Sequence, residues 1–122
     1  MTAPDLDAIA QALFDAFVAG DLGLVRTLCR PDATITQNGA TASLDDALVA
    51  IAGMRSVVGD HRYEDVRRVI GDKAIVEEHR VVSTTPTGKP VDLAACVVVR
   101  VDDDGLITEM DEYVDISTFP VG

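Results

Sequence analysis

Residues 91–116 have the sequence VDLAACVVVRVDDDGLITEMDEYVDI, in which two runs of alternating character flank the acidic turn DDDG at 102–105. Alternation with a period of two is typical of a β-strand that buries one of its faces. Strands joined by so short a turn pair antiparallel, because a parallel return needs a dozen or more residues. We therefore predict an antiparallel pair of strands at about 91–101 and 106–116.

The same period of two extends upstream into the middle of the chain. Runs at about 62–70 and 74–85 are typical of strands, and the turn segments GD at 71–72 and PTGKP at 86–90 separate them from their neighbours. The four runs together predict an antiparallel meander in the second half of the chain.

The first 60 residues instead have the spacing of three and four that is typical of helices. Leu6, Ile9, Leu13 and Phe17, for example, form one apolar stripe. Glycine, proline and short polar side chains at the segment ends supply the expected stop and capping signals. The predicted elements are a helix capped by Thr2 or Asp5 and ending at Gly20, a second helix from Asp21 to before Pro31, a strand at 33–37 turned at Asn38-Gly39, and a third helix from Ser43 to about Val58.

Helices gathered before a strand meander predict an α+β fold and not an alternating α/β fold. The chain has 122 residues, which is enough for one domain of ordinary size, and it contains no internal repeat or linker. Hydrophobic residues make up 48% and charged residues 25% of the chain, as in globular proteins. We predict a single domain over residues 1–122.

The composition also excludes several functional classes. Ten Lys and Arg against 21 Asp and Glu give a net charge of -11, which argues against binding to nucleic acid or to an anionic membrane surface. No apolar run approaches the ~20 residues that span a bilayer, and the first residues lack the features of a signal peptide, so a cytoplasmic location is expected. Cys29 and Cys96 are expected to be reduced thiols. His61 and His79 are too far apart for a zinc motif, and we expect no metal and no cofactor.

Glu112 lies in the middle of the apolar face of the last predicted strand. A carboxylate there costs several kcal/mol unless it is paired, hydrated or protonated, which makes it a candidate for acid/base chemistry. A structural ion pair or a position at a sheet edge is the alternative. The other residues of this face are Leu106, Thr108, Met110, Val114 and Ile116.

The strand at 74–85 offers two similar faces, each with apolar ends and a polar middle. If Glu78 and Arg80 lie on the inner face, an acid and a permanent cation stand side by side, and the arginine can hold two carboxylates and separate their pKa values. Glu77 and His79 then point outward, with His79 on the surface or in an interface. The alternative is a solvated face that carries Glu78 and Arg80.

The order of elements and several motifs resemble the nuclear transport factor 2-like superfamily, which includes ketosteroid isomerase, SnoaL-like polyketide cyclases and limonene-epoxide hydrolase. The resemblance covers nearly the whole chain and implies a curved antiparallel sheet, wrapped by the three N-terminal helices into a cone with a deep apolar pocket. One fold of this kind hosts many functions. The motifs are Phe14-Asp15-Ala16-Phe17-Val18-Ala19-Gly20-Asp21, Pro31-Asp32-Ala33-Thr34, Pro86-Thr87-Gly88-Lys89, Gly105-Leu106-Ile107-Thr108 and Asp111-Glu112-Tyr113-Val114-Asp115.

Limonene-epoxide hydrolase is the member to which the Pro-Thr-Gly-Lys turn and the last strand are most similar. The resemblance implies that Glu112 activates water, that Asn38 holds this water, and that Glu78 and Arg80 supply the family's acid and cation in exchanged order. Thr36 stands where the family has a tyrosine. The residues expected to line the pocket are Thr36, Val82, Leu93, Ala95, Val97, Met110 and Val114.

Three functions follow as hypotheses. The first is acid/base opening of an epoxide or a related step on a small apolar molecule, and the second is an isomerase or cyclase that moves a proton next to a carbonyl. Ketosteroid isomerase chemistry fits less well, because Gln37 and Asn38 occupy the region of that family's base. The third is a binding or dimerisation module without catalysis. The resemblance also implies a homodimer through the outer sheet face, where Cys96, Val98, Tyr113 and His79 are expected.

Overall fold

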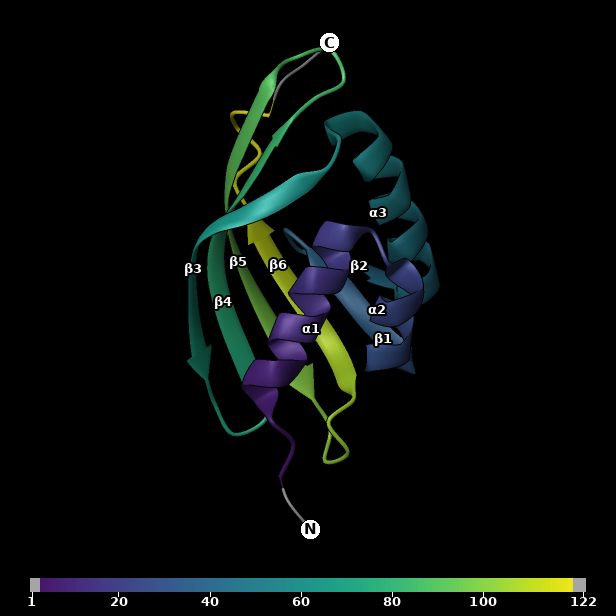
Figure 1. Cartoon of the computed structure of the whole chain (residues 1–122). Helices are drawn as coiled ribbons and strands as arrows, with labels where there is room; N and C mark the ends of the chain where they lie inside the picture. Colours follow the sequence, from purple (N-terminus) through teal and green to yellow (C-terminus); the bar gives the residue numbers. More distant parts are fainter. Residues whose placement is uncertain (1–2, 120–122) are drawn as a thin grey trace.

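The computed structural model of the chain describes residues 3–119, and its helices and strands follow the predicted order (Figure 1). All the predicted helices and the four strands of the meander are present. The elements are α1 (Leu6–Ala19), α2 (Leu22–Leu28), β1 (Cys29–Gln37), β2 (Ala40–Ser43), α3 (Leu44–Val58), β3 (His61–Ile70), β4 (Ala74–Thr84), β5 (Pro90–Val101) and β6 (Ile107–Val114).

The helix ends are set by the capping residues that the sequence indicates. Asp5 and Asp21 accept hydrogen bonds from backbone N–H groups three residues ahead and begin α1 and α2. Ser43 begins α3 in the same way. Gly20 ends α1 with a φ of 72°, in the left-handed region where glycine is favoured.

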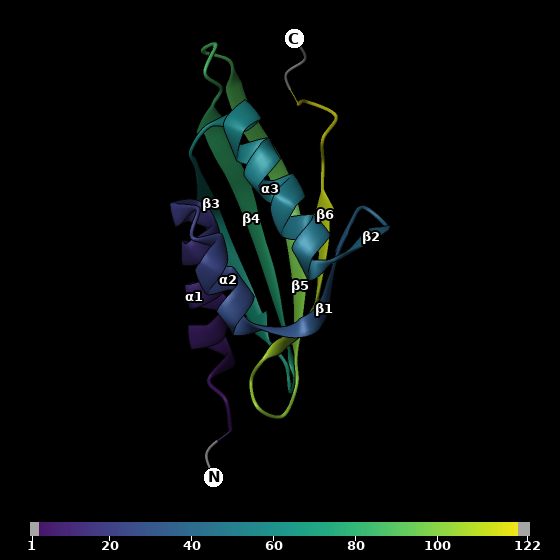
Figure 2. The same ribbon diagram turned by 90° about the vertical axis from the view of Figure 1, so that its right-hand side faces the viewer.

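The sheet has the strand order β2-β1-β6-β5-β4-β3 and is curved and open (Figures 1 and 2). The strands β3 to β6 form the predicted antiparallel meander. The prediction of a wholly antiparallel sheet is wrong at one pair, because β1 and β6 run parallel. These two strands are distant in sequence, so no tight turn fixes their relative direction.

The predicted turn at Asn38-Gly39 is confirmed, and it leads into β2, which the sequence analysis missed. Asn38 and Gly39 have φ angles of 47° and 87°, as a two-residue hairpin turn requires. The strand before this turn is longer than predicted and begins at Cys29, so α2 ends at Leu28 before Pro31 is reached. Cys29 is a free, buried thiol, and burial raises its pKa to about 11.

Two groups of helices cover different parts of the inner face of the sheet. The helix α1 packs against β3 and β4, whereas α3 packs against β1 and β2 (Figure 2). Inner-face residues between these contacts, among them Glu112, Tyr63 and Val114, remain half-buried. The inner face of the sheet is therefore partly exposed to solvent around Glu112, Tyr63 and Val114.

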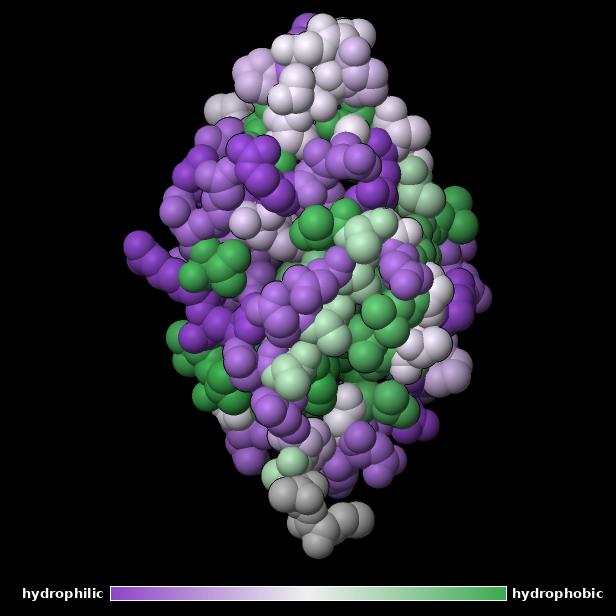
Figure 3. Space-filling view, in the orientation of Figure 1, coloured by the Kyte–Doolittle hydropathy of each residue, from purple (hydrophilic) through white to green (hydrophobic). Residues whose placement is uncertain are grey.

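The surface of the helical side is mostly hydrophilic, with hydrophobic side chains in separate groups (Figure 3). Exposed hydrophobic residues occur on β3, at Val66, Val69 and Ile70, and on α3, at Val49 and Val57. Within residues 3–119, no helix is both long enough and apolar enough to cross a membrane.

We expect opposite effects from two alanine substitutions in and after α3. Gly59 follows the helix with φ 77° and ψ -172°, and an added Cβ would lie 2.8 Å from the carbonyl oxygen of Thr84. Gly59→Ala should lower the free energy of unfolding by about 1–3 kcal/mol. Gly53 lies within α3 with open space around it, so Gly53→Ala should raise that free energy by about 0.5–1 kcal/mol. Denaturant unfolding checks both, and changes of the same sign would contradict the account.

Candidate functional site

Strand pairing places Glu77 and His79 on the inner face of β4. Glu77 pairs with Val97 and His79 pairs with Ala95, and these two partners belong to the apolar inner face of β5. Glu77 is 1% exposed and His79 is 4% exposed. The prediction that Glu78 and Arg80 face inward is therefore wrong, as is the outward placement of His79. Both faces of β4 have apolar ends, so only the register with β5 distinguishes them.

The guanidinium of Arg80 forms ion pairs with carboxylates on the outer face of the sheet. Its guanidinium donates to both carboxylate oxygens of Asp92, at 3.0 and 3.1 Å, and to Asp65 at 2.6 Å. These bonds raise the pKa of Arg80 and hold its charge away from Glu112. Thr36 and Val82, which were expected in the pocket, also pair with outer-face residues.

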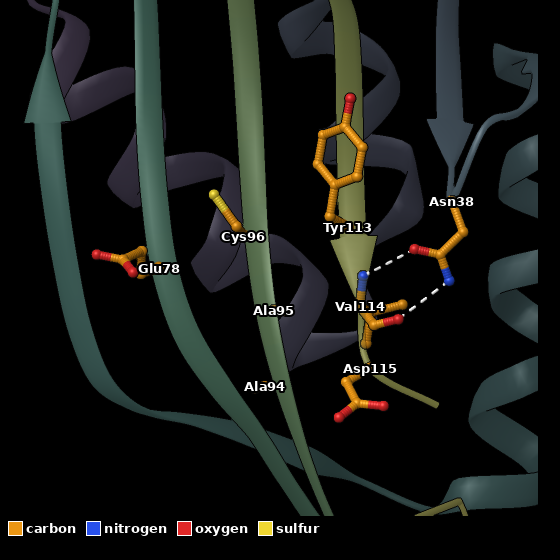
Figure 4. A pocket seen from close by; sticks show the side chains of 8 residues that line it. All are labelled: Asn38, Glu78, Ala94, Ala95, Cys96, Tyr113, Val114 and Asp115. Atoms are coloured by element: carbon orange, nitrogen blue, oxygen red, sulfur yellow. Dashed lines mark hydrogen bonds between the residues drawn. The ribbon is translucent and has the colours of Figure 1, made fainter. Parts of the chain in front are cut away.

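The side chain of Asn38 is bonded to the backbone of β6. The Asn38 amide nitrogen donates to the carbonyl of Val114 at 3.0 Å, and its amide oxygen accepts from the N–H of Val114 at 3.0 Å. Both bonds are drawn in Figure 4. The side chain therefore fixes the end of β6 against the hairpin turn.

Glu77 is a buried carboxylate whose two oxygens have different partners. Oε1 accepts from Nε of Arg68 at 2.8 Å and lies 2.6 Å from Nη2 of the same residue. Oε2 lies 2.7 Å from Nδ1 of His79. Arg68 in turn donates to Asp7 of α1 at 2.7 Å. A charge this deeply buried is tolerated only with such pairing.

The two ring nitrogens of His79 differ, because Nδ1 is hydrogen-bonded to Glu77 whereas Nε2 has no partner among residues 3–119. Because a carboxylate only accepts hydrogen bonds, Glu77 places the proton on Nδ1 and leaves the lone pair of a neutral ring on Nε2. Nε2 has no hydrogen-bond partner within residues 3–119, although it is buried. Since the two nitrogens of the ring point in diverging directions, Nε2 points away from Glu77. An unpartnered buried nitrogen of this kind is a candidate proton acceptor.

Aromatic side chains fix the plane of the His79 ring. Tyr63 of β3 stacks on it with centroids 4.0 Å apart and planes 21° apart, and Phe14 of α1 meets it edge-on at 5.3 Å. Burial, together with the negative charges of Glu112 and Glu77, raises the pKa of Tyr63, so its hydroxyl stays neutral. His61 lies beside Tyr63 with centroids 5.0 Å apart, and burial lowers its pKa.

Glu112 lies on the inner face of β6, as predicted. It pairs with Val97, which also pairs with Glu77, so the two carboxylates flank β5 about two strand spacings, or ~10 Å, apart. Gln37 donates to Oε1 of Glu112 at 2.8 Å. Burial raises the pKa of Glu112, against smaller opposing effects from Gln37 and the charge of His79. Glu112 is thus a candidate proton donor.

Five of the residues expected to line the pocket do lie on the inner face. Ala95 and Val97 lie on β5, between the strands that carry His79 and Glu112. The five residues are Leu93, Ala95, Val97, Met110 and Val114.

Arg68 and Tyr63 were missed because β3 contains a bulge. The register between β3 and β4 shifts between Glu64 and Arg67, and Asp65 has a φ of 55°. An odd-numbered and an even-numbered residue therefore share the inner face, which simple alternation excludes. The signal in the sequence that could have identified Arg68 is a positively charged residue placed to pair with Glu77 across the tight hairpin between β3 and β4.

Among the described residues, no three His, Cys, Asp or Glu side chains are placed to hold a metal ion.

The outer face of the sheet carries a separate shallow hollow of about 360 Å³ (Figure 4). Cys96 lies at its centre, between Glu78 on β4 and Tyr113 on β6. The expected outward positions of Cys96, Val98 and Tyr113 agree with the strand pairing. The residues that line this hollow include no buried carboxylate–histidine pair comparable to Glu77 and His79.

The curved six-stranded sheet, the helices on its inner face and the polar groups between them define an α+β protein of the nuclear transport factor 2-like class. A family model described as "SnoaL-like domain" matches residues 10–110. The chain therefore belongs to the SnoaL-like family, which confirms the resemblance seen in the sequence.

Solved structures with low sequence identity share this fold. A candidate polyketide cyclase from Xanthomonas campestris pv. campestris is 17% identical with a TM-score of 0.84, and the match covers 93% of each chain. IdmH, a candidate polyketide cyclase from Streptomyces antibioticus, is 22% identical with a TM-score of 0.81, covering 92% of this chain and 93% of that one.

A third solved structure shares the fold. It is a hypothetical protein with a ketosteroid isomerase-like fold from Catenulispora acidiphila, in complex with trimethylamine. It is 17% identical with a TM-score of 0.78, and the match covers 95% of this chain and 89% of that one. No curated protein matches the chain significantly.

Proposed function

We propose that the chain is an acid/base enzyme that moves a proton next to the carbonyl group of a small apolar molecule, in the manner of an isomerase or cyclase. The observation that carries the proposal is the buried, unpartnered Nε2 of His79, with Nδ1 held by Glu77. The descriptions of two similar structures as candidate polyketide cyclases support the same class of reaction.

His79 is the base in this reaction. Its Nε2 takes a proton from the carbon beside the carbonyl, and the electron pair of the broken C–H bond forms the enolate. The positive charge that the ring gains lies 2.7 Å from the carboxylate of Glu77, which offsets it. The same nitrogen can return the proton to a different carbon, which completes an isomerisation.

Glu112 is the acid. Because burial raises its pKa, the neutral carboxyl group can donate a hydrogen bond or a proton to the carbonyl oxygen as negative charge develops there. Because Glu112 and His79 lie on the strands at either side of β5, a substrate bound over the inner face of β5 would contact both acid and base. In a cyclase, the enolate carbon attacks a second carbonyl carbon of the same molecule and forms the ring bond. The π electrons of that carbonyl move onto its oxygen, which takes up the proton that Nε2 of His79 had removed.

Opening of an epoxide is the second candidate, because the raised pKa of Glu112 also provides a proton donor for an epoxide oxygen. Nε2 of His79 would take a proton from water as the water oxygen attacks an epoxide carbon. The carbon–oxygen bond then breaks, and its electron pair stays on the oxygen that receives the proton of Glu112. In this reading His79, and not Glu112, activates the water.

Solvent isotopes distinguish the two candidates. The purified protein is incubated with small cyclic ketones and 1,3-diketones in D₂O, and with small cyclic epoxides in H₂¹⁸O. Protein-dependent deuterium uptake beside the carbonyl supports proton transfer at carbon, whereas ¹⁸O in a diol supports hydrolysis. If the ketones, diketones and epoxides bind to the protein but react no faster than in buffer alone, the proposal of catalysis is wrong.

The charge state of Glu112 should be visible in the pH dependence of stability. Its pKa is raised in the folded state, so the protein loses stability as pH rises from the ordinary glutamate range through that raised value. Glu112→Gln removes this loss and should be more stable than wild type above that range, by on the order of 1 kcal/mol, with little difference at lower pH. Turnover should be lost in the folded variant. Thermal unfolding across pH tests this, and a variant with full activity would exclude the acid role.

We infer further that the outer face of the sheet contacts a second copy of the chain. The hollow around Cys96, with the exposed ring of Tyr113 beside it, supports this arrangement. Sedimentation of wild type and Tyr113→Glu tests the proposal. A dimer that the substitution dissociates is expected, and a wild-type monomer at high concentration would contradict it.

A further inference from the structure

Arg68 bonds to the oxygen of Glu77 that does not contact His79. Its side chain is 13% exposed, and two of its nitrogens lie within 2.8 Å of the same oxygen of Glu77. The second oxygen of Glu77 is left for His79. Arg68 also donates to Asp7 at 2.7 Å and to Gln11 at 3.3 Å, both on α1. Five residues from three elements thus form one continuous series of hydrogen bonds.

The charges in this series determine where the proton of His79 lies. A buried carboxylate with only a histidine beside it favours the doubly protonated, positive ring, in which Nε2 carries a proton and cannot accept one. Arg68 supplies a positive charge that no working pH removes. With Glu77 already balanced by Arg68, the ring can stay neutral and keep its lone pair.

We propose that Arg68 is a positioning residue that keeps His79 neutral with Nε2 available, and that Asp7 in the first turn of α1 holds Arg68 in place. The inference rests on the proposed function, in which Nε2 is the base. The proposal gives α1 a role in keeping His79 neutral, because Asp7 of α1 binds Arg68. Asp7 is the solvent-exposed end of the hydrogen-bond series, with 68% of its side chain exposed.

Other charged and titratable groups face this series from each neighbouring element. Tyr63 and His61 lie on β3, Glu112 lies on β6, and Arg55 of α3 lowers the pKa of His61. Burial disfavours the charge of Arg68, but its bonds to Asp7 and Glu77 outweigh this and raise its pKa. Only Arg68 among these groups is bonded directly to Glu77 as a permanent cation.

Nitrogen NMR of the histidine rings tests the proposal without any substrate. The chain has two histidines, so His61→Gln assigns the ring signals of ¹⁵N-histidine-labelled protein. The ring shifts are followed from pH 5 to 9 in wild type, Arg68→Gln, Arg68→Lys and Asp7→Asn. Arg80→Gln is the matched control, since Arg80 also bonds carboxylates but on the outer face of β4.

In Arg68→Gln, the positive form of the His79 ring should persist to a pH higher by about one unit or more than in wild type. Arg68→Lys should restore most of the wild-type titration, Asp7→Asn should shift it less than Arg68→Gln does, and Arg80→Gln should leave it unchanged. A titration of Arg68→Gln that superimposes on wild type overturns the proposal. So does a shift of equal size in Arg80→Gln.

If Arg68→Gln fails to fold, the effect of Arg68 on the His79 ring is measured in variants that also lack the charge of Glu77. Arg68→Gln/Glu77→Gln removes both charges, and Glu77→Gln alone leaves Arg68 unbalanced. The ring should lose its proton at a lower pH in Glu77→Gln than in the double variant, and equal midpoints overturn the proposal. Because no turnover is measured, an unsuccessful substrate search contradicts the proposed function and not this inference.

Discussion

Glu77→Gln should lower kcat by a factor of about 10³–10⁴ and the free energy of unfolding by about 3 kcal/mol. The glutamine keeps the shape of Glu77 but its NH₂ group donates to Nδ1 of His79, so the ring proton moves to Nε2 and the base is lost. The stability falls because Arg68, which is 13% exposed, loses one of its two carboxylate partners. Steady-state kinetics and denaturant unfolding measure the two effects.

Glu78→Gln is the matched control for this prediction. Glu78 is the next residue of the same strand, is exposed, and lines the outer hollow. Its replacement should change the free energy of unfolding by less than about 0.5 kcal/mol and leave kcat unchanged. Equal losses in the two variants, or a larger loss in Glu78→Gln, would contradict the assignment of faces on β4.

His79→Gln should lower kcat by a factor of about 10²–10⁴ and leave the substrate KM within a few-fold of wild type. Glutamine fills part of the same space but cannot take up a proton at neutral pH. The substitution removes the ring that stacks on Tyr63, so a modest loss of stability is also expected.

His61→Gln provides the comparison for His79→Gln. His61 also contacts Tyr63, with ring centroids 5.0 Å apart, but the residue bonded to Glu77 is His79. Loss of kcat in His79→Gln with retention in His61→Gln is the expected pattern. Retention of wild-type kcat in His79→Gln would rule out Nε2 as the base.

Much of the fold could be predicted from the sequence because local chemistry determines it. The capping residues Asp21 and Ser43, the Asn38-Gly39 turn and the period of two after residue 62 each act within a few residues. The parallel pairing of β1 with β6 could not be predicted in this way, since it joins distant segments without a turn between them.

The site was predictable only where one face of a strand was plainly apolar. Glu112 was identified because Met110 and Val114 flank it on one face, and the pairing with β5 confirms that face. The first residues of this strand were assigned to the wrong face, because the register shifts between Ile107 and Glu109 and buries Ile107 in place of Leu106.

On β4 the sequence offered two equivalent faces, and the family resemblance favoured the wrong one. The faces differ only in their partners across the sheet, Val97 and Ala95 on one side and Cys96 and Ala94 on the other. Such information is non-local, as is the bulge in β3 that brings Arg68 to Glu77. Both are set by tertiary packing.

The central claim is that small apolar molecules bind on the inner face between His79 and Glu112. It is tested most directly by ¹³C-methyl NMR of Ala- and Val-labelled protein titrated with cyclohex-2-enone. Ala95 and Val97 face inward, whereas their sequence neighbours Ala94 and Val98 face outward. The account predicts saturable shifts of the Ala95 and Val97 methyl signals with Ala94 and Val98 unchanged. Shifts confined to Ala94 and Val98 would contradict it.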